Sequence, residues 1–224
     1  MGRVRTASFP SLPASATLRS GGSIDQFSFF FAFYGLILGL AVAELLGGFA
    51  GMVRSQALKK IETQTALVAI LTFVLIVATW VDTFTMSQGI SLGFHDLWPP
   101  ILLGTFYYLA AAVIFPRDPD QFRHLGSYFA ARRQFVIGML FAAELVDFYA
   151  NRYWLIDRYY HYPAAFWAWT VPYNIMIKGV FLALFLVRGR RPTIVLLAVQ
   201  TLLILVPYWQ TGGVQRLWLH LLGY

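Results

Sequence analysis

Long runs of hydrophobic residues, separated by short polar segments, fill most of this chain between residues 27 and 210. A membrane-spanning helix needs roughly 20 predominantly apolar residues. Runs close to or beyond that length cover residues 27–53, 66–86, 97–115, 135–153, 164–187 and 193–209. The pattern predicts an all-α integral membrane protein, built as a six-transmembrane-helix bundle.

The two ends of the chain differ from this membrane domain, which we place at residues 27–210. Residues 1–24 are rich in Ser, Ala, Pro and Gly, include three Arg, and lack the apolar stretch of a secretory signal. We expect residues 1–26 to form a disordered or extended basic tail, although the composition also fits an organellar transit peptide. Residues 211–224 are too short to span a bilayer and are expected to lie at its surface.

Composition supports the membrane prediction and excludes several classes of protein. The chain is 58% hydrophobic and only 12% charged, with mean hydropathy +0.63, whereas soluble domains carry about a quarter charged residues. There is no cysteine, so disulfides, iron–sulfur clusters and thiolate catalysis are excluded. The net charge of +7 lies in loops between apolar runs, which favours contact with lipid over binding of nucleic acid.

Lys and Arg gather in the loops that follow the first, third and fifth hydrophobic runs. Because such residues are retained on the cytoplasmic side, we expect these three loops to be cytoplasmic and both termini to lie outside. The expected location is the cell (inner) membrane, with an organellar inner membrane as the alternative. The residues are Arg54, Lys59, Lys60, Arg117, Arg123, Arg132, Arg133, Arg188, Arg190 and Arg191.

Two glutamates, Glu44 and Glu144, lie inside apolar runs in similar surroundings one hundred positions apart. If the first three and the last three runs are repeats of each other, the odd number of spans in each repeat gives the two repeats opposite orientations in the membrane. This arrangement is the 3+3 inverted repeat found in many transporters. The second and fifth runs hardly match, so chance similarity remains the alternative. A carboxylate inside a membrane helix usually marks a functional site, and Asp147 follows Glu144 by one helical turn. Asp147 also admits a simpler interpretation, in which it is solvated at the outer interface with Asn151 and Arg152.

The fifth run carries Thr170, Asn174 and Lys178 on one helical face, close to a kink expected at Pro172. A buried lysine needs a counter-ion, and Glu44 and Glu144 are the candidate partners, in either a functional or a structural ion pair. Asp82, near the outer end of the second run, is expected to line an external vestibule. The predicted site for an ion, proton or other substrate consists of Glu44, Glu144, Asp147, Lys178, Asn174 and Asp82.

Small residues recur every four positions along the first run, which predicts a surface where another helix approaches closely. This helix-packing ridge consists of Gly35, Gly39, Ala43, Gly47 and Gly51.

Polar residues of the third and sixth runs, among them Tyr107 and Gln200, are interpreted as contributing to packing and interhelical hydrogen bonds. The four histidines all fall outside the runs, and no nucleotide or metalloprotease motif is present. We therefore expect no cofactor, no metal, no catalytic residues and no enzymatic activity.

These features favour a transporter or channel for a small ion or solute, with proton coupling through the intramembrane carboxylates. The alternative is a non-catalytic structural or accessory subunit of a larger membrane complex, favoured by short loops and the glycine ridge. The expected partners are the lipid bilayer and either further copies of the chain or other membrane subunits.

Overall fold

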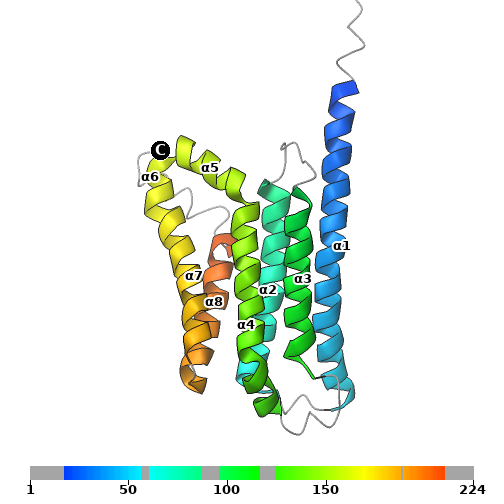
Figure 1. Cartoon of the computed structure of the whole chain (residues 1–224), viewed down its shortest axis with the longest axis vertical. Coiled ribbons are helices and arrows are strands. Elements are labelled where there is room, and N and C mark those ends of the chain that lie inside the picture. Colours follow the sequence, from blue (N-terminus) through cyan, green and yellow to red (C-terminus); the bar gives the residue numbers. More distant parts are fainter. Residues whose placement is uncertain (1–17, 57–60, 87–95, 117–124, 188, 210–224) are drawn as a thin grey trace, which may run out of the picture.

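A computed structural model of the chain describes residues 18–56, 61–86, 96–116, 125–187 and 189–209. Helices occur at all six positions predicted from the hydrophobic runs, and the longest of them lie side by side with alternating direction (Figure 1). The helices are α1 (Leu18–Arg54), α2 (Thr63–Met86), α3 (Trp98–Ile114), α4 (Leu125–Ala150), α5 (Arg152–His161), α6 (Pro163–Ala165), the π-helical turn η4 (Phe166–Thr170), α7 (Val171–Leu186) and α8 (Arg190–Trp209). Residues 1–17 of the tail predicted at 1–26 and the terminal segment at 211–224 lie outside the described residues. Residues 18–26 were also predicted as disordered or extended, but they are helical, because α1 continues outward from its apolar run to Leu18.

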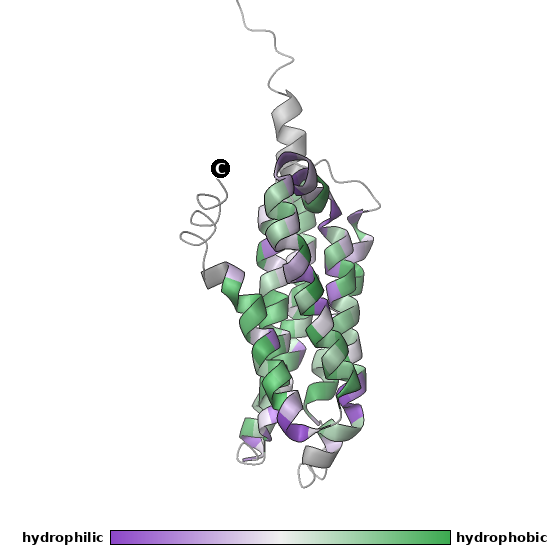
Figure 2. Cartoon of the chain, turned by 90° about the vertical axis from the view of Figure 1, so that its left-hand side faces the viewer, coloured by the Kyte–Doolittle hydropathy of each residue, from purple (hydrophilic) through white to green (hydrophobic). Residues whose placement is uncertain are grey.

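Four segments of the described chain are long and apolar enough to cross a membrane: Phe27–Arg54, Thr63–Thr85, Pro163–Leu186 and Arg190–Pro207. Helix α3 has 17 residues and is shorter. Helix α4 has 26 residues, but charged side chains at both ends reduce its hydropathy. Hydrophobic residues line most of the helices, and hydrophilic ones gather mainly toward their ends (Figure 2). The described chain is thus all-helical and compatible with a membrane protein, whereas six transmembrane spans are not confirmed.

Helix α3 occupies the middle of one side of the bundle, between α1 and α4. Helix α2 packs on α8, and α7 packs between α4 and α8. In Figure 1, α1 therefore lies at one edge of the bundle, and α7 with α8 at the other. The buried core comes from every long helix and includes Tyr34, Leu38, Leu71, Leu75, Leu103, Tyr107, Ile137, Leu140, Phe181 and Leu197.

The two halves of the chain do not share one packing pattern. Helix α1 packs closely along α3, which is two helices later in the first half. Its counterpart α4 packs along the same α3 and along α7. The inverted repeat is accordingly not confirmed.

The predicted kink near Pro172 takes the form of a π-helical turn immediately before it. In η4 the Val171 N–H donates to the Phe166 carbonyl, five residues earlier. Pro172 occupies the start of α7, where the missing backbone N–H is tolerated. The span predicted at 164–187 is thus an α6–η4–α7 helix with a wider turn near its outer end.

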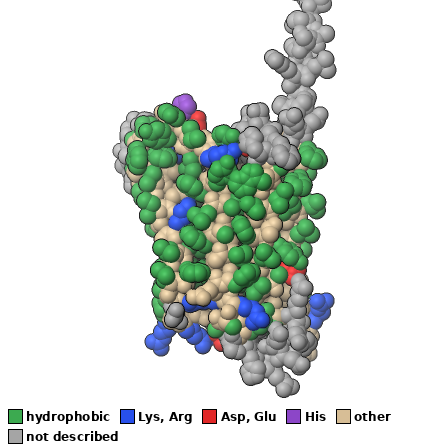
Figure 3. Space-filling view, in the orientation of Figure 1, with side chains coloured by type: hydrophobic (Ala, Val, Ile, Leu, Met, Phe, Trp, Pro, Cys, Tyr) green, Lys and Arg blue, Asp and Glu red, His purple; other side chains and the backbone are tan. Residues whose placement is uncertain are grey.

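The C-terminal ends of α1, α3 and α7 all lie at the same end of the bundle, the lower end in Figure 1. Lys and Arg side chains cluster at that end (Figure 3). Among them, Arg54 ends α1 and Arg190 begins α8. This arrangement agrees with the predicted charge asymmetry, while the side of the membrane that it faces stays a prediction. We call this end inner and the opposite end outer.

Candidate functional site

The outer third of α4 carries two of the predicted carboxylates, Glu144 and Asp147, one helical turn apart. Both side chains are half-buried. The Asn151 side-chain amide donates a hydrogen bond to Asp147 Oδ2 at 3.1 Å. The other oxygen, Oδ1, is fully buried and has no hydrogen-bond partner in the described part of the chain. Asp147 is therefore held at one oxygen and left open at the other.

Lys178 approaches these carboxylates from α7. Its Nζ donates to Asn174 Oδ1 at 2.9 Å, and the Asn174 amide donates to the Thr170 carbonyl at 2.9 Å. The same Nζ lies 4.4 Å from the ring centroid of Phe148 on α4. The predicted face of Thr170, Asn174 and Lys178 is thus present as one hydrogen-bonded chain that turns the lysine toward the outer end.

The positive charge of Lys178 interacts electrostatically with both Glu144 and Asp147. Within the described chain neither carboxylate forms a direct ion pair with it, so the attraction acts over more than 4 Å. Lys178 instead donates its hydrogen bond to the side chain of Asn174. A cation held close to carboxylates without neutralising them leaves them able to accept a proton or another cation.

Asp82 of α2 completes a group of three acidic side chains. It is half-buried and interacts electrostatically with Glu144 and Asp147. We call Asp82, Glu144 and Asp147 the carboxylate cluster. Of the six predicted site residues, the structure thus brings together five, since Lys178 and Asn174 adjoin the same cluster.

Glu44, the sixth predicted residue, lies elsewhere. It is half-buried on α1, at the opposite edge of the bundle from Lys178 on α7 (Figure 1). Tyr34, on the same helix, lies within electrostatic range of Asp82 and Asp147. Glu44 lies ten residues further inward, which is about 15 Å along the axis. The structure therefore does not place Glu44 beside Lys178 or Glu144, and its role in a site stays a prediction.

Three tyrosines surround the carboxylate cluster, and the sequence pattern did not single them out as site residues. The Tyr107 hydroxyl on α3 is fully buried and shares a 2.9 Å hydrogen bond with Thr79 on α2. The Tyr173 hydroxyl on α7 donates to the Leu203 carbonyl at 2.9 Å. The Tyr34 hydroxyl lies near Thr83, although it makes no hydrogen bond of good geometry to any described residue.

Each of these tyrosines lies within electrostatic range of at least two members of the carboxylate cluster. The sequence feature that could have identified these tyrosines as site residues is the position of each phenol on an otherwise apolar helical face. That signal is weak, because tyrosine also serves as an ordinary packing residue. With these residues the site draws on α1, α2, α3, α4 and α7.

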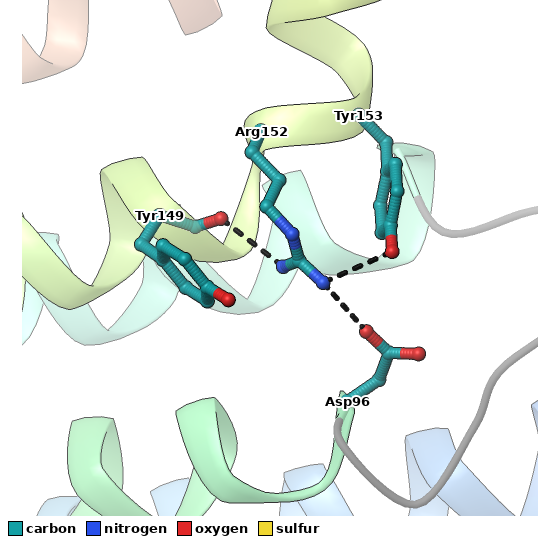
Figure 4. Close-up of polar contacts among 4 residues, drawn as sticks. All are labelled: Asp96, Tyr149, Arg152 and Tyr153. Atoms are coloured by element: carbon teal, nitrogen blue, oxygen red, sulfur yellow. Dashed lines mark hydrogen bonds and ion pairs between the residues drawn. The ribbon is translucent and has the colours of Figure 1, made fainter.

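A second polar group lies further toward the outer end, where α4 meets α5. Arg152 donates to Asp96 Oδ1 at 3.0 Å, to the Tyr153 hydroxyl at 3.1 Å and to the Tyr149 carbonyl at 3.2 Å (Figure 4). Its guanidinium also lies over the rings of Tyr149 and Tyr153, 4.5 and 4.3 Å from their centroids. Trp98 packs against Tyr149 with the ring centroids 5.0 Å apart.

These contacts tie the start of α3 to the start of α5. Desolvation acts to lower the pKa of Arg152, but the hydrogen bonds to Asp96 and Tyr153 outweigh it and raise the pKa. Sequence reasoning had grouped Arg152 with Asp147 and Asn151, whereas its ion pair is made with Asp96. Asp96 precedes a Trp-Pro-Pro helix start, and no sequence spacing connects that position to residue 152.

The predicted helix-packing ridge on α1 makes little close contact within the described chain. A Cβ added at Gly39, Gly47 or Gly51 would meet nothing within 4 Å, and one added at Gly35 would lie 3.5 Å from Trp80. The close approaches of α1 involve other glycines: a Cβ added at Gly104 on α3 would collide with Ile37, and one added at Gly48 would lie 3.0 Å from Phe115. Whether the ridge packs against another molecule stays a prediction.

Comparisons with known proteins identify no relative of this chain. No protein-family model matches the chain, and neither a curated protein nor a solved structure resembles it significantly.

Proposed function

We propose that this chain is a polytopic membrane protein that moves a small ion, most simply a proton, through the carboxylate cluster beside Lys178. The observation that carries the proposal is the convergence of three carboxylates and one lysine from α2, α4 and α7. Carboxylates inside a membrane domain are costly and typically mark ion or proton pathways.

The balance of charge supports a mobile cation. Glu144 and Asp147 lie one helical turn apart, and if both were ionised beside the single ammonium of Lys178 they would repel each other among apolar side chains, which is unfavourable. A bound proton or cation relieves that repulsion. Since each carboxylate interacts with charged neighbours on another helix, a gain or loss of a proton changes the forces between helices.

A proton suits this geometry better than a metal ion. Among the described residues, no group of three or more His, Cys, Asp or Glu side chains is arranged to hold a metal. Proton transfer needs only a chain of groups that donate and accept hydrogen bonds. The tyrosine hydroxyls and the Asn151 amide beside the cluster provide such groups.

In the proposed protein all six long helices span the membrane, including α3 and α4. Helix α4 tolerates its charged residues because Glu144 and Asp147 lie near Lys178 and Asp82, while Arg133 near the inner end donates to Thr193 Oγ1 on α8 at 2.8 Å. The links after α1, α3 and α7 would face the cytoplasm, in the cell (inner) membrane of a bacterium or an organellar inner membrane.

A flux assay on the purified protein tests the proposal. Liposomes that contain a trapped pH-sensitive dye and carry a potassium-diffusion potential should show proton entry that depends on the protein. Glu144→Gln and Asp147→Asn should each reduce this flux at least about tenfold, as expected for groups that carry the proton. Asp157→Asn is the matched control, because Asp157 is an exposed carboxylate on α5. Absence of flux from the unaltered protein across protons, alkali cations and halides would overturn the proposal.

A second candidate function is that of an accessory subunit in a larger membrane complex. It is favoured by the ridge on α1, where Gly39 and Gly47 have open space within the described chain. Small residues of this kind let a second helix approach closely. Gentle solubilisation from native membranes distinguishes the two: a subunit co-purifies with defined partners, and Gly39→Leu releases it, whereas a self-sufficient transporter purifies as a monomer or homo-oligomer.

A further inference from the structure

Gln200, in the middle of α8, has no place in the site described so far. Its side chain is fully buried. Neither the amide nitrogen nor the amide oxygen has a hydrogen-bond partner among the described residues. The sequence pattern predicted a packing and interhelical hydrogen-bonding role for Gln200; the side chain is packed in the core, but the predicted bond is absent among the described residues.

A buried amide with both ends unpaired is unfavourable unless something else satisfies it. The occupant must accept a hydrogen bond from the nitrogen and donate one to the oxygen. A water molecule does both and is the usual occupant of such positions in proteins. Other buried polar residues of α8 are already satisfied, since Thr193 and Thr201 bond to carbonyls of their own helix.

The height of Gln200 in the bundle follows from the contact between Arg133 and Thr193. Gln200 lies seven residues outward of Thr193 on α8, and Glu144 lies eleven residues outward of Arg133 on α4. At about 1.5 Å per residue, Glu144 is about 6 Å further toward the outer end than Gln200. This value is an offset along the bundle axis. Across the bundle, Tyr173 lies near Glu144 and Asp82 and donates to the carbonyl of Leu203, three residues outward of Gln200 on α8.

The region inward of Gln200 is apolar and tightly filled. Leu197 lies one turn inward on the same face of α8, Val136 and Ile137 lie at a similar depth on α4, and Leu140 is level with Gln200. All four are at most 1% exposed. We call these four residues the apolar layer.

We propose that Gln200 forms the inner end of a hydrated site that begins at the carboxylate cluster, and that its amide holds water there. The apolar layer separates this water from the inner end of the protein. The inference deepens the proposed proton-moving function and rests on it for its role. In that role, water at Gln200 receives the proton from the cluster, and the apolar layer must open for the proton to continue inward.

The absence of cysteine from the natural chain allows a direct test of hydration. Gln200→Cys and Leu197→Cys place single thiols one turn apart on the same buried face. A small charged methanethiosulfonate reagent reacts with the thiolate, which forms only where water reaches it. Gln200→Cys in the folded protein should react at least about tenfold faster than Leu197→Cys. Equal, very slow reaction of both would overturn the hydrated site.

A second variant keeps the test decisive if the cysteine variants do not fold. Gln200→Met replaces the amide by an apolar side chain of similar size, so it should raise the melting temperature if water alone satisfies Gln200. A lower melting temperature would mean that Gln200 makes a structural contact and would overturn the inference. In liposomes the same variant should lose at least about tenfold of the proton flux if the water relays protons.

The two proposals fail in different ways. A reactive Gln200→Cys in a protein that conducts no ions would refute the transport function and leave the hydrated site standing. Normal flux in Gln200→Met would refute the relay role of Gln200 and leave the transport function standing.

Discussion

The ammonium group of Lys178 donates to Asn174 Oδ1 at 2.9 Å, one turn earlier on the same helix. This contact keeps the lysine within electrostatic range of Glu144 and Asp147 while leaving a direct ion pair unformed. Lys178 thus balances part of the cluster's charge without occupying its oxygens.

Coupling between Lys178 and the cluster should be measurable in a double-mutant cycle. Lys178→Met removes the positive charge and Glu144→Gln removes one negative charge, so the double variant should lose less stability than the sum of the single variants. We expect a coupling of about 0.5–3 kcal/mol, because the two charges interact directly. Chemical denaturation in detergent micelles measures it.

The matched control for this cycle is Glu44→Gln. Glu44 lies on α1, across the bundle from Lys178, so its cycle with Lys178→Met should show coupling near zero. Strong coupling to Glu44 together with none to Glu144 would contradict the arrangement of α1 and α7.

Helices α1 and α3 should depend on a glycine at position 104. A Cβ at Gly104 would collide with Ile37 on α1, so Gly104→Ala should destabilise the protein by about 1–3 kcal/mol through overpacking. Gly138→Ala is the control, because its Cβ would meet only Phe185 at an ordinary 3.8 Å. Thermal unfolding of the two variants should differ clearly, and equal melting temperatures would count against the close approach.

Leu38 and Gly39 are adjacent on α1 and should behave oppositely. Leu38 is 2% exposed, so Leu38→Ala should cost about 2–5 kcal/mol by leaving a cavity. Gly39 has open space around it, so Gly39→Leu should barely change the stability of the isolated chain. If Gly39→Leu instead dissociates an oligomer on a sizing column, the ridge is a contact between molecules.

The Arg152 contacts at the outer end should add stability rather than transport activity. Arg152→Gln removes the ion pair with Asp96 and the contacts with two tyrosine rings, which should cost about 1–3 kcal/mol. Arg191→Gln, an exposed arginine on α8, should cost little. Denaturation curves measure both, and an unchanged midpoint for Arg152→Gln would show that the group contributes nothing to stability.

Orientation can be determined by labelling single cysteines from outside intact cells. Ser55 follows α1 at the inner end and is exposed, and Tyr160 on α5 is 73% exposed. With the inner end in the cytoplasm, an impermeant maleimide should label Tyr160→Cys and leave Ser55→Cys unmodified until the cells are opened. The reverse pattern would mean that the protein is inserted the other way round.

Helix positions and helical faces could be read from the sequence because both depend on local properties. A hydrophobic run favours a helix in lipid wherever it occurs, and a spacing of four places residues on one face. For this reason the six helices and the line of Thr170, Asn174 and Lys178 appear where they were predicted. The ends of the helices depended on neighbouring contacts and shifted: the run at 135–153 ends as a helix at Ala150.

Which faces meet was decided only by the tertiary structure. Glu44 and Glu144 have similar sequence surroundings, yet the packing of α1 along α3 sends Tyr34, and not Glu44, to the carboxylate cluster. The same packing uses Gly104 as its close contact and leaves Gly39 open. Asp96 and Arg152 meet although 56 positions separate them. Such contacts follow from the rotation and tilt of each helix against its neighbours, which the order of residues along one helix does not specify.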